Sequence, residues 1–237
     1  MLATASNPNT VGGFLRAGAS RHREWLLQER THLVWFCLAA VVVGAGSYGA
    51  VMGCWRSPLQ ALYTGIKLPL VILLTTLSNG LLNGMLAPLL GLNTTFRQSF
   101  VIVLMSFAIA SVVLGALSPV ALFLVWNTPP LTAVTASSSQ EYGFMQLTLA
   151  VFVAVAGTIG NVRLVPLLCE WTGNARIARN VLFAWLAVNL FLGSQICWVL
   201  RPFIWGQTDQ VTFIGRNCFQ GSFFETVFDA ARRLLFS

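Results

Sequence analysis

Charged residues are scarce in this chain. Only 9% of its 237 residues are Asp, Glu, Lys or Arg, whereas soluble domains carry about 25%. Hydrophobic residues make up 56%, and the mean hydropathy is +0.74. So few charges cannot cover a water-soluble surface of this size. The composition therefore predicts an integral membrane protein with a single helical domain in the bilayer.

Histidine and acidic residues are also few, which excludes several kinds of membrane site. The two histidines, His22 and His32, both precede the first apolar run. A bis-histidine haem or a histidine-based zinc site at bilayer depth therefore lacks its ligands. None of the seven acidic residues lies deep in an apolar run, so a carboxylate proton relay lacks its groups. The five cysteines show no metal-ligand spacing. We expect no metal and no cofactor.

Catalytic motifs are missing as well. The sequence contains no P-loop, no H-E-x-x-H and no G-x-S-x-G, and we therefore expect no enzymatic activity. The net charge is +7, but most arginines flank apolar runs. That placement is typical of contact with anionic lipid headgroups. We expect the lipid bilayer as a partner, and no nucleic acid.

Apolar runs of span length dominate the rest of the sequence. About 20 apolar residues are needed to cross a bilayer as a helix. Five runs reach that length, over residues 33–53, 68–92, 99–126, 144–168 and 181–200. The sequence therefore predicts an all-α polytopic transmembrane helical bundle of about five spans, in a transmembrane domain over residues 33–200.

Two polar flanks enclose this domain. The N-terminal segment, residues 1–32, ends in a mixture of Trp, Leu and charged residues that predicts a surface helix over 20–32. In the C-terminal tail, residues 201–237, Ser222 and Glu225 have the spacing of a capping box. Apolar residues follow at helical spacing. We therefore expect amphipathic surface helices at both flanks.

The second apolar run carries a doubled Asn-Gly, made of Asn79, Gly80, Asn83 and Gly84. Asn79 and Asn83 share one face of a helix, and asparagine amides in hydrocarbon need partners. Hydrogen bonding between helices is the favoured interpretation. The alternative is a polar site in a broken, re-entrant helix. Asn189 lies near the middle of the fifth run, and we hypothesise that it meets Asn79 or Asn83.

Proline and glycine give further expectations around the first two runs. Pro58 and Pro69 fit first turns of helices, which favours a short surface helix over residues 58–67 before the second span. Gly49 and Gly53 form a small-xxx-small pair through which another helix can approach closely. The alternative is that glycine is simply common in membrane helices.

Arginines near the ends of the runs bear on orientation. Arg163 lies toward the end of the fourth run, which favours snorkelling to the headgroups over a buried functional charge. The distribution of arginines slightly favours a cytoplasmic N-terminus. A re-entrant Asn-Gly segment would exchange the sides of all later segments.

The layout of a polar basic N-terminus, five apolar spans and a short tail resembles the Yip1-like membrane proteins. Three segments also resemble an uncharacterised family of bacterial polytopic membrane proteins: Trp55-Arg56-Ser57-Pro58-Leu59-Gln60-Ala61-Leu62, Lys67-Leu68-Pro69, and Leu200-Arg201-Pro202-Phe203. The resemblance implies a multi-pass protein of the bacterial inner membrane. It brings no activity and no functional residues.

These features predict a membrane scaffold or accessory subunit of a membrane complex, without catalytic activity. Glycine faces, membrane asparagines and amphipathic flanks are means of contact with lipid and with other helices. We expect another membrane protein, or a second copy of the chain, as partner. The alternative is a small transporter or channel subunit with a polar site around Asn79 and Asn83.

Overall fold

The structure is a computed structural model that describes residues 18, 20, 24, 31–89, 95–128, 136–203, 211–215 and 218–225. Its helices are α3 (Thr31–Cys54), α4 (Pro58–Leu89), α5 (Phe96–Asn127), α6 (Ala136–Val162), α7 (Leu164–Thr172) and α8 (Ala175–Val199). The described ranges contain no strand. Five segments are long and apolar enough to cross a membrane. The all-α fold of about five spans is therefore confirmed, and the chain is a multi-pass membrane protein.

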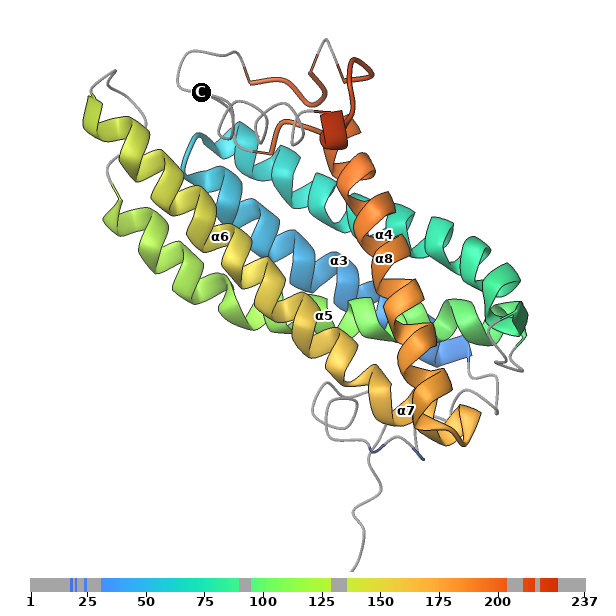
Figure 1. The fold of residues 1–237 in the computed structure, drawn as a ribbon. Helices are drawn as coiled ribbons and strands as arrows, with labels where there is room; N and C mark the ends of the chain where they lie inside the picture. The colour runs from blue at the N-terminus through green and yellow to red at the C-terminus, as the bar shows by residue number, and fades with distance from the viewer. Residues whose placement is uncertain are drawn as a thin grey trace, which may run out of the picture.

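The long helices alternate in direction around α3 (Figure 1). Helix α3 packs on both α4 and α5, α6 packs on α5, and α8 packs on α4. The short helix α7 connects α6 to α8. The chain thus enters α3 at one end of the bundle and leaves α8 at the other. The tail lies at that second end, beside the start of α4.

Small residues let α3 lie at the centre. A Cβ atom on Gly44 would overlap the backbone carbonyl of Ser111 in α5. A Cβ atom on Gly49 would lie 2.5 Å from the Thr64 carbonyl oxygen, and one on Gly53 would lie 2.6 Å from Ala61 Cα. Both distances are well inside van der Waals contact. The predicted packing face of Gly49 and Gly53 is therefore confirmed, and the helix that approaches it is α4.

Helix α4 corrects two expectations. It runs unbroken from Pro58 to Leu89, so residues 58–67 are not a separate surface helix, and the doubled Asn-Gly does not re-enter. Ser57 fixes the start, because its Oγ accepts a hydrogen bond from the Gln60 amide at 3.1 Å. Within the helix, Gly80 makes room for a neighbour. A Cβ atom there would lie 2.5 Å from the Phe100 ring of α5.

The later boundaries also move. The fourth run is divided at Arg163 between α6 and α7. Helix α8 begins at Ala175, earlier than expected, because the Asn174 side chain caps it by accepting from the Arg176 amide at 2.9 Å. Gly173, at φ 62°, ends α7 in the left-handed region that favours glycine.

Little of the two predicted surface helices is described. Ser20 and Glu24 are helical, and residues 21–23 and 25–30 lie outside the described residues. In the tail, the Ser222 amide donates to Glu225 Oε2 at 2.8 Å, and the Glu225 amide donates to Ser222 Oγ at 3.1 Å. The predicted capping box is therefore confirmed. Residues 226–237 lie outside the described part.

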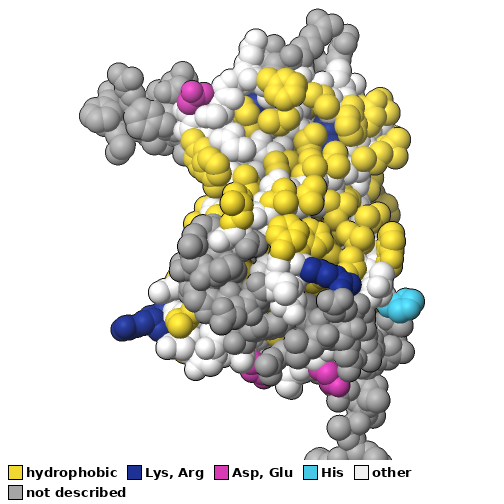
Figure 2. Space-filling model, turned by 90° about the vertical axis from the view of Figure 1, so that its right-hand side faces the viewer, with side chains coloured by type: hydrophobic (Ala, Val, Ile, Leu, Met, Phe, Trp, Pro, Cys, Tyr) yellow, Lys and Arg dark blue, Asp and Glu magenta, His cyan; other side chains and the backbone are white. Residues whose placement is uncertain are grey.

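The surface of the bundle matches a lipid environment. Figure 2 shows hydrophobic side chains spread as a broad belt over one face, with most charged side chains toward its ends. Large apolar side chains such as Val43 and Trp126 are 70% and 77% exposed. A water-soluble domain would bury such side chains, whereas hydrocarbon accepts them.

Candidate functional site

A line of buried polar side chains runs along α4, and we call it the α4 polar stripe. Its members are Gln60, Thr64, Lys67, Thr75 and Asn79. They share one face of the helix, because each lies three or four residues from the next once the apolar Val71 is counted between Lys67 and Thr75. All five are 3% exposed or less. A spanning helix with its polar face turned inward uses that face for contacts with other parts of the chain.

The middle of the stripe meets α8. Asn79 Nδ2 donates a hydrogen bond to Asn189 Oδ1, so the hypothesised pairing of Asn189 with Asn79 is confirmed. One helical turn away, Gly193 lies against the Thr75 side chain, with room left for a Cβ atom at 3.7 Å. The backbones of Asn83 and Gly84 continue α4 beyond the pair, and their side chains lie outside the described part.

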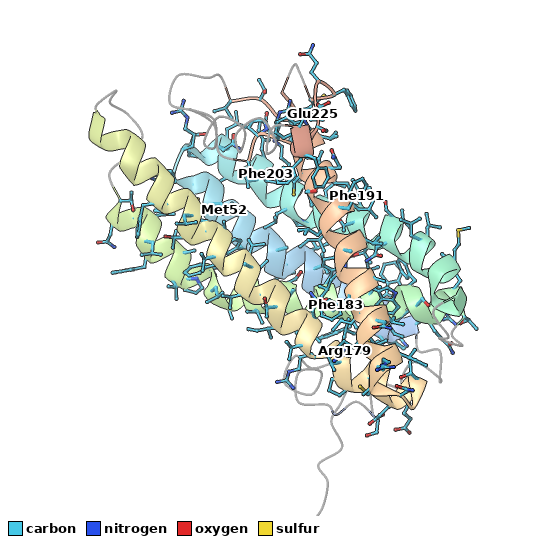
Figure 3. All side chains as sticks on the ribbon, viewed as in Figure 1. Met52, Arg179, Phe183, Phe191, Phe203 and Glu225 are labelled. Atoms are coloured by element: carbon cyan, nitrogen blue, oxygen red, sulfur yellow. The ribbon has the colours of Figure 1, made fainter. Side chains whose placement is uncertain are left out.

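The other end of the stripe meets the tail (Figure 3). The Phe203 carbonyl oxygen accepts from Gln60 Nε2 at 2.6 Å and from Thr64 Oγ1 at 2.8 Å. The preceding carbonyl, of Pro202, accepts from Lys67 Nζ at 2.7 Å. Three donors at successive turns of α4 thus hold two consecutive carbonyl groups of the tail. These bonds fix the segment that follows α8 onto the first turns of α4.

Lys67 is a fully buried cation within a span. Among the described residues, no acidic side chain forms an ion pair with it. Its Nζ lies 5.8 Å from the ring centroid of Phe203 and 5.2 Å from that of Phe213. The ammonium group is therefore stabilised by one carbonyl dipole and by the faces of two aromatic rings. A charge held in this way is costly to bury and is a candidate for function.

Two polar atoms of the stripe have no hydrogen-bond partner in the described part of the chain: Gln60 Oε1 and Thr75 Oγ1. The neighbouring Thr76 shows the usual alternative, because its Oγ1 donates to the Ile72 carbonyl at 2.7 Å. Buried polar atoms normally find partners, so these two mark positions where α4 can accept a further group.

The other predicted positions lie elsewhere. Gly49 and Gly53 pack α3 against α4, and Gly80 packs against α5. Arg163 is exposed at the junction of α6 and α7, and its snorkelling to the headgroups stays a prediction. The structure therefore joins Asn79 with Asn189, and it does not bring Arg163 to the stripe.

Sequence reasoning missed Gln60, Thr64, Lys67 and Thr75. Their spacing was a usable signal, because polar residues at steps of three and four share a helical face. The partners were not visible, since 135 to 143 residues separate this part of α4 from the tail carbonyls that it binds. The expectation of a surface helix over 58–67 also concealed the pattern.

Metal ligands do not gather in the described residues, where no group of three or more His, Cys, Asp or Glu side chains could hold an ion. No family model, no curated protein and no solved structure matches this chain. The resemblance to Yip1-like proteins and to a bacterial polytopic family therefore stays a prediction.

Proposed function

We propose that this chain is an integral membrane scaffold or accessory subunit of a membrane complex, without catalytic activity of its own. The main support for this proposal is that the α4 polar stripe binds other parts of the same chain. Asn79 binds Asn189, and the donors at the other end bind backbone carbonyls of the tail. Polar side chains in a transport site face a hydrated path or a substrate. Here they hold one part of the chain to another.

The exposed surface of α8 supports a role in assembly. Phe183 and Phe191, both labelled on α8 in Figure 3, are 62% and 56% exposed, and Leu190, seven residues after Phe183, is 74% exposed. Such a face fits lipid or the apolar face of another membrane helix. We propose another membrane protein or a second copy of the chain as partner, together with the bilayer, and no nucleic acid.

Purification of the tagged protein in mild detergent from its native membrane tests this proposal. We expect a stoichiometric partner that is lost when Phe183→Ala and Leu190→Ala are combined. Val43→Ala is the matched control, because Val43 is also exposed, at 70%, but lies on α3. A homo-oligomer would contradict the accessory role and leave a self-associating scaffold. A bare monomer would contradict both.

A small transporter or channel subunit is the second candidate, and Lys67 favours it. Ionisable residues inside membrane spans commonly lie on ion or substrate paths. Flux in proteoliposomes, compared between wild type and Lys67→Gln, distinguishes the two roles. The transport role expects flux that Lys67→Gln removes while the bundle stays folded. The scaffold role expects no flux from either protein.

We further propose that the protein lies in the bacterial inner membrane with its N-terminus in the cytoplasm. The arginine distribution and the family resemblance support this. Cys54 provides the test, because it is exposed where α3 ends. A membrane-impermeant maleimide added to intact cells should label Cys54, and Cys54→Ser should lose that label. Labelling that requires lysis would place the N-terminus outside.

A further inference from the structure

The first turns of α4 are covered by a strap, which we define as residues 200–203 and 211–215. The Gly215 amide donates to the Arg201 carbonyl at 3.3 Å and joins the two parts of the strap. Phe213 packs edge-on against Tyr63 of α4, with ring centroids 5.3 Å apart. The strap therefore lies directly over the Gln60 end of the α4 polar stripe.

The strap removes strong donors from water. Gln60 is only the third residue of α4, at the end of a helix bundle where side chains usually meet solvent, yet it is 0% exposed. Its Nε2, Thr64 Oγ1 and Lys67 Nζ all donate to neutral carbonyl oxygens of the strap. An anionic oxygen is a stronger acceptor for such donors than a neutral carbonyl.

We propose that Gln60, Thr64 and Lys67 form a binding site for a protonated phosphate group, and that the strap occupies this site with its Pro202 and Phe203 carbonyls while phosphate is absent. This inference goes beyond the scaffold role and does not depend on it. The phosphate oxygens accept from the three donors in place of the two carbonyls. Lys67 supplies the positive charge that balances the anion.

The unpartnered amide oxygen selects the class of anion. Gln60 Oε1 is buried and has no donor among the described residues. A phosphate that keeps one P–OH can donate to it, and phosphomonoesters carry that proton in part near neutral pH. Sulfate and carboxylate do not carry a proton there. The group therefore belongs either to inorganic phosphate or to a lipid phosphomonoester such as phosphatidate.

The position of the site allows either source. Lys67 lies nine residues after Pro58, which is about 13 Å along the helix axis. Gln60 and Thr64 lie closer to the end of the span. A lipid headgroup or a dissolved anion would approach the site from this end of the span, because the headgroup region borders the hydrocarbon core there.

The test uses the full chain in phosphatidylcholine nanodiscs, titrated with inorganic phosphate, and in a second set of nanodiscs that contain phosphatidate. Binding is measured by calorimetry for the dissolved anions. The aromatic NMR signals of Phe213 report the strap, since its ring packs against Tyr63 of α4 with ring centroids 5.3 Å apart. We expect phosphate or phosphatidate to shift these signals, because the strap must leave its site and the two rings must separate.

Substitutions assign the effect to the three donors. Lys67→Gln keeps a donor for the Pro202 carbonyl but removes the charge, and we expect it to weaken phosphate binding at least about tenfold. Arg179→Gln is the matched control, because it removes the same charge from an exposed position on α8. If Lys67→Gln does not fold, Thr64→Val removes one donor at constant shape. Sulfate should bind about tenfold more weakly than phosphate.

The outcomes separate the sources and decide the proposal. A response to inorganic phosphate, or to phosphatidate alone, supports the site and names its ligand. No response to either anion overturns it. An unchanged response in both Lys67→Gln and Thr64→Val also overturns it, as does binding that leaves the Phe213 signals unaltered.

Discussion

Helices α5 and α8 are fixed in the same bundle by different means. Helix α5 is buried along most of its length. A Cβ atom added to Gly115 of α5 would lie only 3.1 Å from the Cα of Gly44 in α3. Helix α8 buries only Ala178, Val181 and Trp185, and its middle is joined to α4 by the Asn79–Asn189 hydrogen bond. Membrane helices gain little from the hydrophobic effect when they associate.

The difference teaches where the bundle can change. Because their backbones lie close together, α3 and α5 attract each other through many weak van der Waals contacts, and the loss of any one of them changes the stability little. The attachment of α8 and of the strap depends on a few directional bonds. A single side chain can therefore weaken α8, whereas α5 yields only to a group that separates whole helices.

The largest effect is expected at the crossing of α3 and α5. Gly44→Ala places a methyl group against the Ser111 carbonyl, and the helices must separate. We expect a loss of about 3 kcal/mol in the free energy of unfolding. Gly157→Ala is the matched control, because nothing lies within 4 Å of its added Cβ. Unfolding in mixed micelles with increasing SDS measures both, and equal stability of the two variants would contradict the close crossing.

The next effect separates α8 from α4. Asn189→Leu removes the acceptor to which the buried Asn79 amide donates, and we expect a loss of about 2 kcal/mol. Adding Asn79→Leu removes the other half of this pair and should recover part of that stability. The same SDS titration gives the coupling energy of the pair. A double variant as unstable as the sum of the single variants would show that the two amides do not interact.

A smaller effect is expected between α3 and α6. Tyr48, buried in α3, donates its hydroxyl to the Leu149 carbonyl at 2.8 Å. Tyr48→Phe removes only that bond, and we expect a loss of about 1 kcal/mol. The ring keeps its packing, so stability should fall without any change in helix content. No change in the SDS midpoint would show that α6 is held by packing alone.

The smallest effect is expected outside the bundle. Ser222→Ala removes the cap whose Oγ accepts from the Glu225 amide, and it should cost the helical turn over residues 223–225 about 0.5 kcal/mol. Hydrogen exchange at Glu225 should become faster, while the unfolding midpoint of the spans stays constant. A shift of that midpoint would mean that this turn also supports the bundle.

Much of this fold was predictable because the thickness of the bilayer fixes the length of a spanning helix. Runs of about 20 apolar residues give the number of spans without any knowledge of their partners. The pair of Gly49 and Gly53 and the capping box of Ser222 were also local patterns, and both are confirmed. The pairing of Asn79 with Asn189 could be proposed because both lie near mid-depth in their spans.

The site at the strap could not be predicted in the same way. Lys67 and Pro58 looked like the boundary of a span, since charge and proline usually mark one. Lys67 is instead held inside by a carbonyl 135 residues away. A contact between residues so far apart in sequence leaves no local pattern. In the sequence, a polar residue at the boundary of a span looks the same as one that the tail covers in the folded protein.

This separation has a consequence for how the protein is made. Helix α4 leaves the ribosome with its polar side chains in place, but Asn189 follows Asn79 by 110 residues and the strap comes later still. At about 5–20 residues per second, Asn79 waits roughly 5 to 20 s for its partner. During synthesis the incomplete bundle therefore presents an amide and an ammonium group before the last span and the tail have covered them, so a truncated or stalled chain keeps polar groups exposed that the complete chain buries.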